Sequence, residues 1–329
     1  MMASDDLSKY QIKSITPVDH YVCSLSEETQ KRAFEEFGET EELRQKSIKE
    51  IRDWVLNNPR IEKCRLDSKN ILRYLRHHNY DMDCAKESFE RALIFRQNYE
   101  FVGDLDFEKA NMKELLEAGL ITVLPGYSKT GERIICSKMS AASPKTPNVA
   151  FTGMCLATQV FEVLLNDEEN QVRGFHYIFD VSGITLRHYF VLPFTTWFKV
   201  LKNCERTYSG RHRGCHVLNF PGPLIFIIKI AFKHMHEKMR NGIKFYSNLD
   251  ELEIIDKDEL PDVLGGKTSI QNLADYWKKK LTEFRPFLLN YSNQKVNLDS
   301  YSSSVANCEV KSLAHRIENP NAKLLKSNN

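Results

Sequence analysis

The chain has 329 residues, of which 42% are hydrophobic and 27% charged, and its net charge is +2. This composition is typical of a globular protein with one large domain or two smaller ones. It excludes a membrane-spanning protein, because no apolar stretch reaches the roughly 20 residues that a spanning helix needs. The N-terminus has no basic segment followed by an apolar one, so we expect no secretory signal.

Eight cysteines are scattered along the chain, without a CxxC pair and without histidines at zinc-finger spacing: Cys23, Cys64, Cys84, Cys136, Cys155, Cys204, Cys215 and Cys308. This pattern disfavours both a structural zinc site and a disulfide framework. It predicts free thiols in a reducing compartment.

Motifs typical of enzymes are absent from the sequence. No strand is followed by GxGxxG or GxxxxGK[ST], and no GxSxG occurs. His176 and Asp180 are four positions apart on a predicted strand and could pair, but no nucleophile accompanies them. We therefore expect no catalytic residue, no cofactor and no metal site.

The first 119 residues predict helices joined by short turns. Residues 1–26 are polar and are expected to be flexible, and residues 27–119 are expected to form a helical domain. The predicted helices are 27–57 with Ser26 as N-cap, 68–78 with Asp67 as N-cap, 82–99 with Asp81 as N-cap, and 107–118 ending at Gly119.

The hydrophobic period changes after residue 119 and predicts an α/β domain over residues 120–290. Strands alternate with helices there, which favours a mostly parallel sheet. The expected elements are a hairpin of 120–124 with 133–138, a long helix opening at Thr146 and Pro147, strands at 175–183, 215–220 and 243–248, and a helix at 269–281. Residues 291–329 are rich in Ser and Asn, and we expect a disordered tail.

One segment, Leu224–Met239, is apolar almost all round its first two turns and polar in its second half. Between Lys199 and Lys244 there are ten basic and two acidic residues, a net +8, which leaves −6 on the remainder of the chain. A buried core helix is one interpretation of the apolar segment. The other is a lid, which covers an apolar ligand and docks, with its basic flanks, on an anionic membrane.

Four motifs in this order resemble the CRAL-TRIO (Sec14-like) lipid-binding family: ILRYLRHHNYD (71–81), FDVSG (179–183), RHRGCHVLNFP (211–221) and LPDVLGG (260–266). The resemblance covers about Glu27 to Leu281, and the tocopherol and retinaldehyde carriers are the most similar in character. It implies a lipid-binding domain with a mostly parallel sheet flanked by helices and a mobile lid helix, preceded by an N-terminal helical bundle domain.

The resemblance also implies a lipid pocket on one face of the sheet. Its expected lining is Met154, Ala157, Phe161, Phe175, Tyr177, Phe179, Phe194, Leu201, Leu224, Ile227, Ile228 and Ala231. Plain core packing is the alternative interpretation of each of these side chains.

A phosphoinositide-binding patch is the second site that the resemblance implies. Its expected members are Arg211, Arg213, Lys238 and Arg240, and guanidinium groups suit forked contacts to phosphate. The family has a further arginine where this chain has His78. Gly210 and Gly242 stand where the phospholipid-exchange branch has a Glu and a Lys, so exchange of phosphatidylinositol by that mode is not expected.

The sequence thus predicts a monomeric, non-enzymatic carrier that is cytoplasmic and peripherally associated with membranes. It is expected to bind a single hydrophobic lipid, a tocopherol, a retinoid or a similar molecule, in a lidded pocket. Transfer is expected at phosphoinositide-containing membranes, and no nucleic acid is expected as a partner. The alternative is a membrane-recruited adaptor or regulatory protein that uses the basic groove without a lipid cargo.

Overall fold

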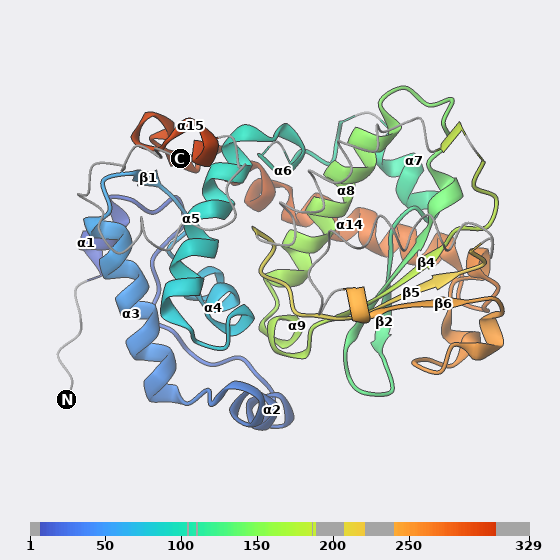
Figure 1. Ribbon diagram of the computed structural model, residues 1–329, viewed down its shortest axis with the longest axis horizontal. Coiled ribbons are helices and arrows are strands. Elements are labelled where there is room, and N and C mark those ends of the chain that lie inside the picture. The colour runs from blue at the N-terminus through green and yellow to red at the C-terminus, as the bar shows by residue number, and fades with distance from the viewer. Residues whose placement is uncertain are drawn as a thin grey trace, which may run out of the picture.

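The computed structural model describes residues 7–103, 105–109, 111–185, 187–188, 207–220 and 240–306. Helices from the N-terminal third of the chain form one half of the molecule, and a sheet with its helices forms the other (Figure 1). None of the helices in this described part of the chain is both long enough and apolar enough to span a bilayer.

Seven helices precede the sheet in the described part of the chain: α1 Ser8–Gln11, α2 Glu27–Phe37, α3 Glu41–Asn57, α4 Ser68–His77, α5 Met82–Asn98, α6 Glu100–Gly103 and α7 Met112–Glu117. The last of them, α7, lies on the side of the sheet and packs against α8 (Val149–Leu165) and α14 (Ile270–Leu289) (Figure 1). The predicted caps Ser26, Asp67 and Asp81 are confirmed, since each side chain accepts a hydrogen bond from a backbone N–H in the first turn. The predicted single helix 27–57 is wrong. Gly38 ends α2 with a positive φ of 68°, and Thr40 caps α3.

The sheet has the order β2-β3-β4-β5-β6. Its strands are β2 Thr122–Tyr127, β3 Arg133–Lys138, β4 Phe175–Asp180, β5 His212–Leu218 and β6 Ile243–Tyr246. Only the β2–β3 pair is antiparallel among these neighbours, so the predicted hairpin and the mostly parallel sheet are confirmed.

The first crossover consists of α8 Val149–Leu165 and α9 Glu168–Arg173. The predicted start of the long helix at Thr146 and Pro147 is wrong. Asn148 precedes the first turn with a positive φ of 55°, and its side chain makes no capping hydrogen bond. Val149, Leu156 and Val160 are buried and form the inner face of the helix.

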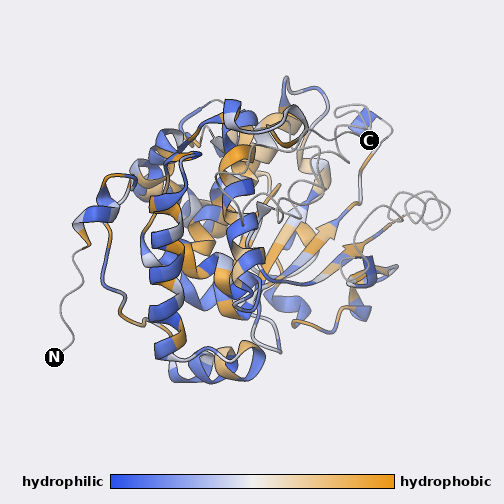
Figure 2. Cartoon of the chain, turned by 60° about the vertical axis from the view of Figure 1, so that its left-hand side comes forward, coloured by the Kyte–Doolittle hydropathy of each residue, from blue (hydrophilic) through white to orange (hydrophobic). Residues whose placement is uncertain are grey.

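The two faces of the sheet pack against different parts of the chain. The face toward α8, here called the α8 face, carries Val123, Ile135 and Phe175 in the main core. The opposite face carries Ile134 and Ile178 in a second core, closed by the segment after β6 through Leu252, Ile255, Leu260 and Leu264. Hydrophobic stretches of the strands lie in the centre of the sheet (Figure 2).

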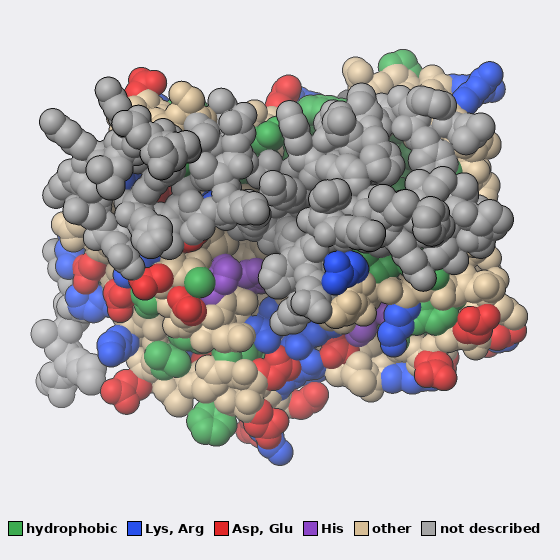
Figure 3. All heavy atoms as spheres, in the orientation of Figure 1, with side chains coloured by type: hydrophobic (Ala, Val, Ile, Leu, Met, Phe, Trp, Pro, Cys, Tyr) green, Lys and Arg blue, Asp and Glu red, His purple; other side chains and the backbone are tan. Residues whose placement is uncertain are grey.

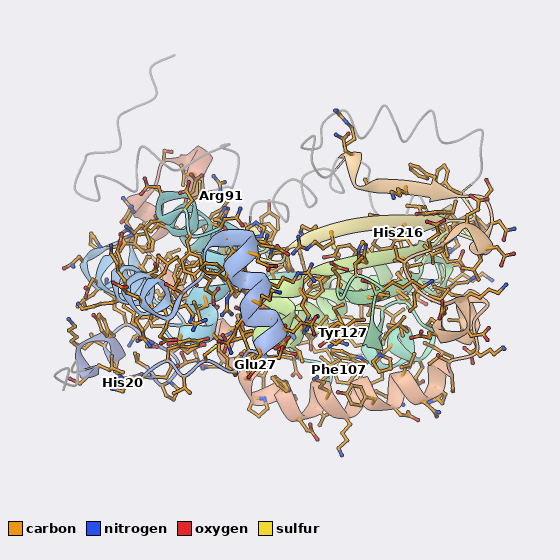
Figure 4. All side chains as sticks on the ribbon, turned by 90° about the horizontal axis from the view of Figure 1, so that it is seen from below. His20, Glu27, Arg91, Phe107, Tyr127 and His216 are labelled. Carbon is orange, nitrogen blue, oxygen red and sulfur yellow. The ribbon has the colours of Figure 1, made fainter. Side chains whose placement is uncertain are left out.

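The C-terminal part returns to the helical half. Helix α14, Ile270–Leu289, runs along one side of the molecule (Figure 4), and β7, Lys295–Val296, then pairs with β1, Ile61–Lys63. A last short helix, α15, covers Ser303–Ala306, with Val305 buried. The prediction of a disordered tail is therefore wrong for residues 291–306, and residues 307–329 lie outside the described part.

The expected flexible N-terminus is also wrong for residues 7–26. Tyr10 and Tyr21 are buried, and the backbone at Ser14 pairs with that at Cys64 in an isolated parallel β-bridge. Burial of these two aromatic side chains removes apolar surface from water and so offsets part of the entropy cost of ordering this polar segment. One continuous core also runs from the N-terminal helices to α8 and α14.

Candidate functional site

A stripe of half-buried side chains runs along α8. Met154, Ala157 and Phe161 are spaced as neighbours on one helix face, whereas Cys155, Leu156 and Val160 are buried. Phe161 contacts Phe175, Tyr177 and Tyr208 of the sheet half, with ring centroids 5.5 to 5.9 Å apart. The predicted trio thus shares one accessible apolar stripe beside the sheet, and its contact with a lipid stays a prediction.

The strand β4 contributes to the same surface with two of its three predicted residues. Tyr177 and Phe179 are half-buried and stack with a centroid separation of 6.2 Å, but Phe175 is fully buried. Phe175 therefore packs as core, while Tyr177 and Phe179 present accessible rings. Tyr177 and Phe179 lie on the same side of β4 because successive side chains of a strand point to opposite faces.

Neighbouring strands add residues that the sequence analysis missed. Cys215 pairs in register with Tyr177, and Ile243 pairs with Cys215, so all three lie on the α8 face, and all are half-buried. The alternation of side chains along β5 and β6 could have identified Cys215 and Ile243 from the sequence. We call the half-buried residues Met154, Ala157, Phe161, Tyr177, Phe179, Cys215, Ile243 and Phe245 the apolar surface.

One polar pair interrupts the apolar surface. The Tyr177 hydroxyl and His212 Nδ1 are 2.7 Å apart. Burial raises the pKa of Tyr177 well above its usual value and lowers the pKa of His212 to about 4, so both groups are neutral near pH 7. The pair offers hydrogen bonds to a neutral polar group and no charge.

Six predicted lining residues lie outside the described part of the chain: Phe194, Leu201, Leu224, Ile227, Ile228 and Ala231. The whole segment Leu224–Met239 also lies outside it. A lid over the apolar surface therefore stays a prediction.

The predicted basic patch divides in the structure. Arg211 and Arg213 come together on the carboxylate of Glu36 in α2, with nitrogen–oxygen distances of 2.9 and 2.6 Å. Arg240 is half-buried and precedes β6, and Lys238 lies outside the described residues. Glu36 was missed by the sequence analysis, because nothing local connects it to a strand 175 positions away.

His78, which replaces the family's further arginine, is half-buried at the C-terminal end of α4. Burial lowers the pKa of His78, although Asp81 and Glu87 act in the opposite direction. The imidazole is therefore neutral near pH 7 and does not supply the positive charge of an arginine.

The opposite face of the sheet carries a chain of polar side chains. His176 Nδ1 lies 3.0 Å from His216 Nε2, and His216 Nδ1 lies 2.9 Å from the Tyr246 hydroxyl. A Cβ on Gly214 would lie 2.8 Å from His176 Nδ1, so glycine allows the two rings to meet. The considered pairing of His176 with Asp180 is not formed, since Asp180 binds Lys138 and Asn219.

Metal chemistry finds no support in the part of the chain that the structure describes. Within it, no three His, Cys, Asp or Glu side chains are placed to hold an ion. The six described cysteines are all free thiols.

The mixed five-stranded sheet, with α8 and the apolar surface on one face and a helical N-terminal region packed beside it, has the CRAL-TRIO fold. Residues 117–266 match the family model described as the CRAL/TRIO domain, so the chain contains a CRAL/TRIO domain. The motifs at 179–183, 211–221 and 260–266 lie within the matched residues, whereas ILRYLRHHNYD (71–81) precedes them.

Similar proteins agree with this assignment. The chain is 28% identical to the human protein called alpha-tocopherol transfer protein-like over 255 aligned residues. The aligned region covers 75% of this chain and 72% of that protein. It is 25% identical over 297 residues to human clavesin-2, covering 88% of each chain. The crystal structure of Sfh5 superimposes with a TM-score of 0.50 at 11% identity, over 79% of this chain and 100% of that one, and it shows the fold alone.

Proposed function

We propose that the protein is a non-enzymatic cytoplasmic carrier, which holds one hydrophobic lipid against the apolar surface and transfers it at phosphoinositide-containing membranes. The observation that carries the proposal is the half-buried state of this surface. Phe161 on α8 contacts Tyr177 on the sheet, and Phe161, Met154 and Ala157 are neither sealed in the core nor fully exposed. Accessible apolar side chains with few polar groups among them are typical of the lining of small-molecule sites.

The cargo in this proposal is a largely apolar molecule with one polar end, such as a tocopherol or a retinoid. Each Å² of apolar cargo surface removed from water contributes about 25 cal/mol before the costs of association. The neutral Tyr177–His212 pair suits a hydroxyl or carbonyl group better than a charged phosphate. The name of the alpha-tocopherol transfer protein-like relatives is consistent with this class of cargo.

Cargo binding is tested by extracting the purified protein with organic solvent and analysing the extract by mass spectrometry. We expect about one lipid per chain from the wild type. Ala157→Trp fills the centre of the stripe on α8 and is expected to lower the recovered lipid at least tenfold, because the indole takes the cargo's volume.

Thr282→Trp, at an exposed position of α14, is the control and should retain the cargo. If the wild type yields no lipid and binds no fluorescent lipid analogue, the carrier proposal is wrong. Vesicle binding without any cargo would favour the adaptor function instead.

Membrane docking is tested by reversing the charge of Arg211, Arg213, Lys238 and Arg240. Each basic residue near an anionic surface contributes about 1 kcal/mol, so sedimentation with phosphoinositide vesicles should weaken at least tenfold. Cargo affinity should not change. The control reverses four exposed lysines elsewhere, Lys129, Lys267, Lys279 and Lys295, and unchanged sedimentation of the first variant would contradict the patch.

A further inference from the structure

Glu36, in the last turn of α2, lies at the centre of three guanidinium groups. Its carboxylate accepts hydrogen bonds from Arg32 Nε at 2.7 Å, Arg211 Nη2 at 2.9 Å and Arg213 Nη2 at 2.6 Å. Burial raises the pKa of Glu36, but the hydrogen bonds from Arg213 and Arg32 outweigh it and lower the pKa overall. Glu36 is therefore an ionised acceptor held between two parts of the chain.

The cluster has more positive than negative charge. Arg32 reaches a second carboxylate, Glu132, at 2.7 Å, so three guanidinium groups share two carboxylates. Burial lowers the pKa of Arg211, and the neighbouring Arg213 lowers it further, which is the sign of crowded positive charge. Basic and acidic side chains gather on the surface below the junction of the two halves (Figure 3).

Arg211, just before β5, and Arg213, within it, have partners besides Glu36. Arg211 Nη1 also donates to the backbone oxygen of Arg76 at 2.6 Å, and its guanidinium lies 4.9 Å from the ring centroid of Phe37. Arg213 Nε donates to the backbone oxygen of Arg173 at 3.0 Å. Since backbone carbonyls are fixed by secondary structure, the guanidinium groups of Arg211 and Arg213 stay in place when the Glu36 carboxylate leaves.

An acceptor with more charge and more oxygens than a carboxylate suits these forks better. A phosphate monoester carries up to two negative charges and three acceptor oxygens, and arginine binds it in a forked geometry. Arg211 and Arg213, with Arg32 beside them, present donors to one common point that a carboxylate now occupies.

We propose that Glu36 occupies a phosphate site formed by Arg32, Arg211 and Arg213, and that a phosphoinositide headgroup must displace it before the protein docks. This inference rests on the proposed membrane function and adds a regulatory contact to it. The closed contact thereby lowers affinity for the membrane until headgroups are abundant.

The test compares Glu36→Gln with the wild type in sedimentation with vesicles containing phosphatidylinositol bisphosphate. Glutamine keeps the shape and removes the competing charge, so we expect at least about fivefold tighter binding, the lower end of typical coupling between sites. Glu35→Gln is the matched control. It removes the same charge one position away, where the side chain is 60% exposed and pairs with Lys31 at 3.8 Å, and it should bind like the wild type.

Adding Arg211→Ala and Arg213→Ala to Glu36→Gln should abolish the gain, which a purely structural contact would not require. Soluble inositol trisphosphate should bind the Glu36→Gln variant more weakly than the vesicles do, and equal binding would assign the site to a free phosphate ligand and overturn the lipid assignment. If Glu36→Gln does not fold, Glu36→Asp, which withdraws the charge by one methylene, should show a smaller gain.

Unchanged vesicle affinity in folded Glu36→Gln would overturn the inference alone. Absence of vesicle binding in both the wild type and the variant would overturn the membrane half of the proposed function as well. Cargo extraction from the same preparations reports separately on the carrier half.

Discussion

Replacing Glu162 by glutamine is expected to lower the free energy of unfolding by about 3–5 kcal/mol, the usual cost of removing one partner from a buried ion pair. Glu162 lies on α8 and is fully buried. It accepts hydrogen bonds from Arg73 Nη1 at 2.7 Å, from the Tyr291 hydroxyl at 2.5 Å and from Arg96. The neutral variant would leave two buried guanidinium groups without a counter-charge.

Urea denaturation at pH 7 measures this loss. Glu117→Gln on α7 is the control, because Glu117 is exposed and pairs with Lys278 at the surface, where a change within about 0.5 kcal/mol is expected. A loss below about 1 kcal/mol for Glu162→Gln would show that water reaches the two arginines. The cluster would then contribute little to the junction between the helical half and α8.

The two arginines of α4, Arg73 and Arg76, show what sequence patterns can and cannot predict. ILRYLRHHNYD identified α4 and its place in the chain, and Asp67 identified its start. The partners of its two arginines are not local. Glu162 is 89 positions from Arg73, and Glu39 and Glu168 are 37 and 92 positions from Arg76. Periodicity reports only on neighbours within a turn or a strand, so these buried ion pairs could not be predicted.

The candidate site was predictable to the same extent. Met154, Ala157 and Phe161 were expected from the family resemblance, and they are half-buried in the structure. Strand alternation is the local signal that puts Tyr177 on the same side as Phe179, and their rings stack. Their assignment to a lipid came from the family resemblance alone. The contact of Glu36 with Arg211 depends on the packing of α2 against the sheet, for which the sequence carries no signal.

The ordered termini were missed for a related reason. Residues 291–306 are polar on average, and average polarity predicted disorder. A few aromatic side chains fix this segment: Tyr291 is buried against the Glu162 cluster, and the Tyr301 hydroxyl donates to Glu90 at 2.6 Å. Composition averages over such anchors, whereas burial depends on each one.

Acidification from pH 6.5 toward pH 5 is expected to destabilise the protein before its carboxylates titrate. Burial, the largest cause in each case, lowers the pKa of His77 to about 3 and those of His212 and His216 to about 4. In the unfolded chain histidine has a pKa of about 6.5. The neutral imidazoles therefore stabilise the fold fully above pH 6.5, and this contribution is lost as the pH falls toward the folded pKa values, because only the unfolded chain binds the protons.

The expected slope is up to about 1.4 kcal/mol per pH unit for each histidine, read from urea denaturation between pH 6 and pH 5. This window lies above the pKa of about 4.3 that glutamate has in an unfolded chain, so the larger loss from carboxylates such as Glu132, whose folded pKa is lowered to about 2, comes at lower pH. His77→Gln should reduce the slope by about one histidine's share, and exposed His20→Gln should not change it. A wild-type slope near zero would mean that these imidazoles are hydrated in the folded protein, so that His212 would not be the neutral partner that the proposed cargo site requires.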